Sequence, residues 1–178
     1  MNMSETIQIN RAPVLTLWAA VVAERLGYKP DEALTLAKAL AGLNAQSKGR
    51  RLGIYPEHPD EGKPEKQRER LEQESFTVEI LGRAVPSVNT KEGIRAVDKD
   101  KAMSPQSVQR YLENKFGGAL PQVRQAFEEL AASFSPQDLK RDAYPLYEKF
   151  RPKIPEGTKG WGAKGSLDLG VVRGLKKE

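Results

Sequence analysis

The chain has 178 residues, of which 38% are hydrophobic and 30% are charged, a composition typical of a globular protein. It contains no cysteine, which excludes disulfides, thiolate metal sites and cysteine nucleophiles. The longest apolar run, Val14 to Ala23, is too short to cross a bilayer, and the first residues lack the basic flank of a signal peptide. We therefore expect a soluble cytoplasmic protein without a membrane partner.

The net charge of +5 is located in one part of the chain. Residues 149–178 contain eight basic and three acidic residues, so the rest of the chain is neutral. The same segment holds the unusual stretch Gly157 to Leu169, in which Lys159 and Lys164 flank Trp161 among four glycines. A polyanionic partner is expected to bind here first.

The N-terminal part of the chain predicts a short edge strand and then a helix. Ile7 and Ile9 alternate with polar residues and favour the strand. Pro13 suits a first helical position, and no helix breaker follows until Gly27. The residues between them are apolar almost all round. This is typical of a helix buried inside the monomer or in a homodimer interface, here one that contains Trp18.

A second helix is predicted from an N-cap at Asp31 to about Ser47, where Gly49 suits a left-handed stop. The segment Val22 to Leu34 also resembles a helix-turn-helix motif. The first residues of its second helix are acidic and then apolar, and such side chains neither bind phosphate nor read bases. The favoured interpretation is a helical hairpin in the core.

A basic segment and then a polar one follow the second helix. Lys48, Arg50 and Arg51 either form a basic helix end that leads into a short strand, or bind phosphate through neighbouring arginines. Residues 56–74 are almost all polar and predict a linker or mobile insertion. They include His58, the only histidine, for which we expect no catalytic role.

A β-hairpin is predicted next. The alternation in Phe76–Leu81 favours a strand, which we expect to continue past Gly82 to Val88. Asn89–Gly93 predicts a turn and Ile94–Val97 a return strand. This hairpin is either a small sheet that covers the helices or a wing that touches a nucleic-acid backbone.

Three amphipathic helices are predicted in the C-terminal half. Serine followed by proline marks the start of the first at Ser104 and of the third at Ser135, and Pro121 starts the second. Pro145 is expected to kink or restart the third helix. The aromatic residues of these helices recur at helical spacing, so we assign them to the core of a small bundle. A short terminal helix is predicted from Asp168.

The predicted fold class is mainly α with a small β-hairpin, which is an α+β fold. It consists of an N-terminal helical hairpin, a C-terminal three-helix bundle and a tail rich in glycine, tryptophan and lysine. The predicted units are residues 1–55, the linker 56–74 and residues 75–178, and the alternative is one compact domain overall.

Enzymatic chemistry is not indicated by the motifs. Gly160–Ser166 approaches the phosphate-binding loop pattern, but its lysine falls one position early and no predicted strand precedes it. One histidine and no cysteine leave only oxygen ligands for a metal, without the spacing of a calcium loop. We expect a protein that is not an enzyme and has no cofactor.

Because no enzymatic motif is found in the sequence, we consider binding functions. The leading hypothesis is a protein that binds nucleic acid, DNA rather than RNA, through contacts with phosphates. Trp161 either stacks on a base or inserts between the helices and holds the tail in place. The alternative hypothesis is a protein-interaction or regulatory module, with a homodimer through the first helix. The predicted nucleic-acid-binding residues are Lys48, Arg50, Arg51, Lys159, Trp161, Lys164 and Arg173.

Overall fold

The computed structural model describes residues 6–51, 75–98, 101–153 and 164–176, and it describes only the backbone of residues 44–51, 75 and 164. The helices are α1 (Arg11–Arg25), α2 (Pro30–Arg51), α4 (Pro105–Phe116), α5 (Leu120–Ala132), α6 (Pro136–Phe150) and α7 (Leu169–Gly174). The strands are β1 (Thr6–Asn10), β2 (Ser75–Ile80), β3 (Arg83–Thr90), β4 (Gly93–Asp98), β5 (Lys101–Ala102) and β6 (Lys164–Asp168). This mixture of helices and antiparallel strands confirms the predicted α+β class.

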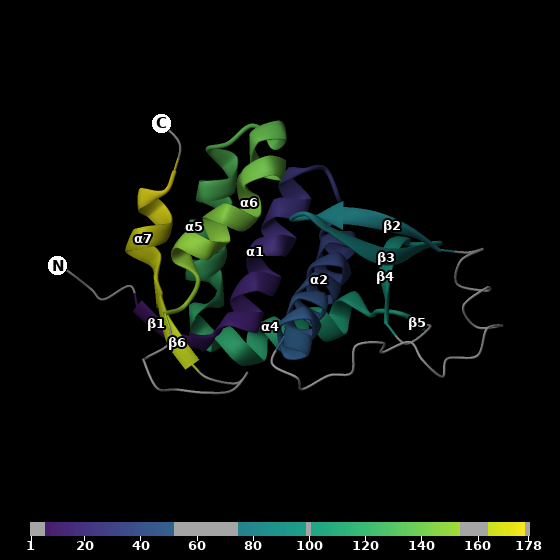
Figure 1. The fold of residues 1–178 in the computed structure, drawn as a ribbon, viewed down its shortest axis with the longest axis horizontal. Helices are drawn as coiled ribbons and strands as arrows, with labels where there is room; N and C mark the ends of the chain where they lie inside the picture. Colours follow the sequence, from purple (N-terminus) through teal and green to yellow (C-terminus); the bar gives the residue numbers. More distant parts are fainter. Residues whose placement is uncertain (1–5, 52–74, 99–100, 154–163, 177–178) are drawn as a thin grey trace.

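The helices lie between two small sheets (Figure 1). The four-stranded sheet, in the order β2-β3-β4-β5, lies on one side of the helices, and the pair β1-β6 lies on the other. The buried hydrophobic residues of all these elements form a single cluster that extends from Ile9 to Val172.

Helix α1 is the centre of this core. Its residues from Pro13 to Ala23 are all buried, and α2, α4, α5 and α6 pack against it. The indole Nε1 of Trp18 donates a hydrogen bond to the carbonyl of Ala143 at 2.9 Å. The rings of Phe127 and Phe150 meet the Trp18 indole edge-on, at centroid distances of 5.6 and 5.3 Å. The helix is therefore buried inside the monomer, and Trp18 is not available for the predicted homodimer interface.

Helix α2 packs along α1 as the predicted core hairpin. Its residues from Ala33 to Ala37 are all buried, so the positions that a recognition helix would offer to DNA lie in the core. Pro30, rather than a residue after Asp31, is the first helical residue, and proline is favoured there because its missing N–H needs no partner. The helix also continues past the predicted end at Ser47 to Arg51, because an internal glycine costs a helix only about 1 kcal/mol.

The four-stranded sheet pairs β2 with β3, β3 with β4 and β4 with β5, all antiparallel, where the sequence predicted a single hairpin. The chain reverses at Leu81 and Gly82, whose φ angles of 50° and 79° suit a two-residue turn, so the predicted continuation of the strand past Gly82 is wrong. β3 then runs to Thr90 and pairs with β4. The turn was missed because leucine rarely adopts a positive φ.

Two side chains of α2 bind the backbone of β4. The carboxylate of Glu32 accepts hydrogen bonds from the N–H of Ile94 and the N–H of Lys29, both at 2.9 Å. The hydroxyl of Thr35 accepts one from the N–H of Ala96 at 3.1 Å. The helix thereby satisfies donors of a strand that β5 covers only at its end, which favours the cover interpretation of the sheet.

Replacing Glu32 by glutamine should lower the free energy of unfolding by about 1 kcal/mol at pH 7. The reason is that a neutral amide oxygen is a weaker acceptor for the two N–H donors than a carboxylate is. Both hydrogen bonds lower the pKa of Glu32, and the one from the N–H of Ile94 has the larger effect. The stabilisation is therefore complete above the unfolded pKa of about 4.3 and is lost as the pH falls through the lower folded pKa.

Urea denaturation of Glu32→Gln and the wild type between pH 7 and pH 3 measures this effect. The difference in stability should disappear at the acidic end. Glu79→Gln is the matched control, because Glu79 is an exposed residue of β2. An equal loss of stability in the two variants would contradict the assignment.

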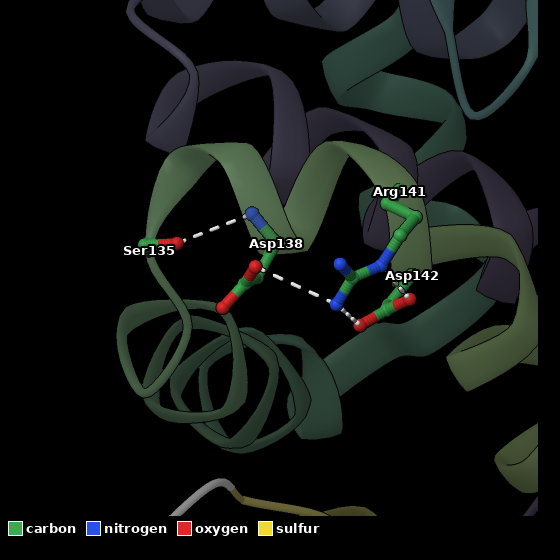
Figure 2. Close-up of polar contacts among 4 residues, drawn as sticks. All are labelled: Ser135, Asp138, Arg141 and Asp142. Carbon is green, nitrogen blue, oxygen red and sulfur yellow. Dashed lines mark hydrogen bonds and ion pairs between the residues drawn. The ribbon is translucent and has the colours of Figure 1, made fainter.

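Two of the three C-terminal helices, α4 and α6, begin at the predicted serine caps, whereas α5 begins at Leu120, one residue before the predicted Pro121, and has no side-chain cap. The hydroxyls of Ser104 and Ser135 accept hydrogen bonds from the N–H groups of Ser107 and Asp138, at 3.3 and 3.1 Å. Figure 2 shows the cap of α6 and, one turn further on, the exposed Arg141 paired with Asp138 and Asp142. α6 runs through Pro145 as one helix, so it does not restart there.

Candidate anion-binding surface

The first and last strands of the described chain form the base of the candidate site. β1 and β6 are antiparallel, with Thr6 opposite Asp168 and Asn10 opposite Lys164. The side-chain amide of Gln8 donates a hydrogen bond to the hydroxyl of Ser166 at 2.8 Å. The predicted edge strand at Ile7 and Ile9 is thus confirmed, and its partner is the C-terminal part of the glycine-rich stretch.

β6 also pairs with the backbone that follows α6. The N–H of Lys153 donates to the carbonyl of Ser166 at 3.2 Å, and the N–H of Ser166 donates to the carbonyl of Lys153 at 3.1 Å. A Cβ atom on Gly165 would lie 2.6 Å from the carbonyl oxygen of Lys153, so only glycine allows this approach. The residues on either side of 154–163 are therefore fixed to each other.

Two arginines come together at this base. The Nε of Arg11 donates a hydrogen bond to the carbonyl of Pro152 at 2.9 Å, which holds the side chain against the residue after Arg151. Burial lowers the pKa of Arg11, and the neighbouring positive charge of Arg151 lowers it further. The first residue of α1 is thus held against the backbone that follows Arg151, and the charges of the two arginines influence each other.

We call Arg11, Arg151 and Lys153 the basic cluster. Arg11 and Arg151 are half-buried, whereas Lys153 is exposed. Within the part of the chain that the structure describes, no carboxylate lies within ion-pair distance of any of them. A group of cations without acidic partners attracts anions, because each cation raises the potential at the others.

The structure places the sequence-predicted residues unequally. Lys159 and Trp161 lie outside the described residues, so the predictions for Trp161 stay open. Lys164 is the first residue of β6, while Lys48, Arg50 and Arg51 belong to the last turns of α2, and only their backbone is described. Arg173 lies in the last turn of α7, after the strand that meets Lys153.

Figure 1 shows that two of the predicted basic segments lie at the same end of the molecule. The C-terminal end of α2, the first residue of β6 and the start of α1 all lie toward the lower edge of the view. α7 leads upward from β6, away from this edge. The arrangement groups the start of β6 and the end of α2 with the start of α1, whereas α7 lies apart from them.

The basic cluster contains residues that the sequence-based site omitted. Arg151 and Lys153 belong to the basic C-terminal segment, so its charge excess was a usable signal for them. Arg11 carries no such signal, because it lies in a neutral region and contacts Pro152 across 141 positions.

Other kinds of site are not found in the described ranges. No group of three histidine, aspartate or glutamate side chains there could hold a metal ion. No described helix combines the length and the apolar character needed to span a membrane. Comparison of the chain with protein-family models, with curated proteins and with solved structures gave no match.

Proposed function

We propose that this protein is a non-enzymatic nucleic-acid-binding protein that binds DNA in preference to RNA. Its contacts are made with the backbone phosphates. The observation that carries the proposal is the basic cluster, which has no acidic partner among the described residues and lies at the base of the C-terminal segment that holds the surplus positive charge. Arginine and lysine at such a surface bind phosphate oxygens and release counterions from the nucleic acid.

The predicted binding residues extend this surface in two directions. Lys159, Trp161 and Lys164 belong to the stretch that starts and ends at the base, where Lys153 pairs with Ser166. In the proposed complex the lysines contact phosphates and the Trp161 ring stacks on a base. The basic end of α2 lies at the same end of the molecule and provides a second contact.

Binding of fluorescent duplex DNA and duplex RNA, followed by anisotropy, should weaken as salt is raised. The slope for DNA should be about 0.9 logarithmic units of affinity per logarithmic unit of salt for each phosphate contacted. Changing both Lys159 and Lys164 to glutamine should remove about two phosphate contacts, and the slope should fall by the corresponding amount. Binding that is undetectable or independent of salt would contradict the proposal.

The control is Lys140→Gln, which removes a positive charge from an exposed position near the start of α6. This variant should retain both the affinity and the salt dependence of the wild type. An equal loss in Lys140→Gln would show that the overall charge of the protein, and not this surface, determines binding.

A further inference from the structure

Arg11 and Arg151 are positioned by backbone contacts, and no acidic side chain of the described ranges pairs with either of them. Arg11 donates its Nε to Pro152, which leaves the two terminal nitrogens of its guanidinium group for another acceptor. The backbone N–H of Arg151 donates to the carbonyl of Tyr147 at 2.7 Å, and its guanidinium group makes no hydrogen bond to any described residue. Two half-buried cations side by side repel each other, and an anion between them would remove that repulsion.

Tyr147 adds a third donor at the same place. Tyr147 is buried, with a relative exposure of 2%. Its ring packs against the rings of Tyr144 and Phe150 at centroid distances of 5.7 and 5.9 Å. No buried side-chain nitrogen or oxygen of the described residues lacks a hydrogen-bond partner. The Tyr147 hydroxyl makes no hydrogen bond to a described residue, so it reaches solvent and is accessible to a ligand.

Tyr147 lies one helical turn before Arg151, at the end of α6, and the Arg11 side chain is held against the carbonyl of Pro152. Burial raises the pKa of Tyr147, and the positive charges of Arg151 and Arg11 act in the opposite direction. The group remains a protonated donor at neutral pH, so it can donate a hydrogen bond to an anion held by the two arginines.

We propose that Arg11, Arg151 and Tyr147 form a binding site for one phosphate group. The two guanidinium forks and one hydroxyl supply donors from three side chains, which suits a tetrahedral oxyanion with several oxygens. We call this set the phosphate site. Its ligand is either a backbone phosphate of a nucleic acid, which rests on the proposed function, or the phosphate group of a small molecule.

Inorganic phosphate tests the phosphate site without a nucleic acid. Sodium phosphate replaces sodium chloride at constant ionic strength, and the arginine Nε–Hε resonances of the full chain are followed by NMR. The resonances of Arg11 and Arg151 should shift to saturation, while that of Arg141, which pairs with acidic neighbours in Figure 2, should not. Shifts that are linear, or equal at all three arginines, would overturn the proposal.

Two variants locate the binding energy. Tyr147→Phe retains the ring and its packing, removes only the hydroxyl, and should weaken phosphate binding about tenfold. Arg151→Gln should weaken it about tenfold to a hundredfold, whereas Arg141→Gln, at the other end of α6, should leave it unchanged. A folded Tyr147→Phe protein that binds phosphate like the wild type would overturn the assignment of the hydroxyl.

The same proteins with duplex DNA separate the two proposals. If phosphate saturates the site and DNA does not bind, the phosphate site stands, its ligand is a small molecule, and the proposed function fails. If DNA binds but phosphate produces no saturable shift at Arg11 and Arg151, the proposed function stands and the phosphate site is overturned.

Discussion

Replacing Trp18 by alanine should lower the free energy of unfolding by about 4 kcal/mol, which is a large share of the 5 to 15 kcal/mol typical of a domain. The indole is fully buried at the point where α1, α5 and α6 meet, and its N–H is hydrogen-bonded to Ala143. The substitution removes this hydrogen bond and the edge-on contacts with Phe127 and Phe150, and the core around α1 cannot close the cavity completely.

Urea denaturation followed by far-UV circular dichroism measures the loss. Trp18→Phe keeps an aromatic ring and should cost only about 1 to 2 kcal/mol. Phe76→Ala is the control, because Phe76 is 36% exposed and its truncation should cost less than about 1 kcal/mol. A Trp18→Ala protein as stable as the control would contradict the central position of this residue.

Replacing Gly165 by alanine should destabilise the protein by about 2 kcal/mol. The added Cβ would lie 2.6 Å from the carbonyl oxygen and 2.8 Å from the carbonyl carbon of Lys153, and both atoms belong to the backbone. Relief of this clash requires β6 to move away from Lys153, which breaks the two hydrogen bonds between Lys153 and Ser166. The affinity for phosphate or nucleic acid should fall in parallel, because the same backbone positions the basic cluster.

Gly42→Ala is the matched control for this prediction. Gly42 is an exposed residue inside α2, and a Cβ there would meet nothing within 4 Å. Alanine is the better helix former, so this variant should gain about 0.5 to 1 kcal/mol. Hydrogen exchange of the Ser166 amide should accelerate in Gly165→Ala alone. Unchanged exchange in that variant would contradict the close approach.

The features predicted correctly from the sequence are those set by neighbouring residues. Ser104 and Ser135 are each followed by proline, and this local pattern determines where α4 and α6 begin. The apolar run around Trp18 predicted a buried helix, although periodicity alone could not decide between burial in a monomer and in a dimer. That choice depends on α4, α5 and α6, which follow far along the chain.

The features that were missed depend on distant residues or unusual backbone. No rule of local sequence pairs β1 with β6, since Gln8 and Ser166 are 158 positions apart. The turn at Leu81 was hidden because leucine is not a turn residue of this type. The same limit applies to the candidate site: the charge excess indicated the C-terminal segment, but Arg11 joins it only through tertiary structure.

The pairing of β1 with β6 also has a consequence for the order of events during translation. At the usual rate of synthesis, β1 waits roughly ten to thirty seconds for its partner strand, which follows it by 158 residues at Gln8 and Ser166. By then the ribosome has already produced the helices of the core. The basic cluster is therefore assembled among the last parts of the fold, after the helices that form the core.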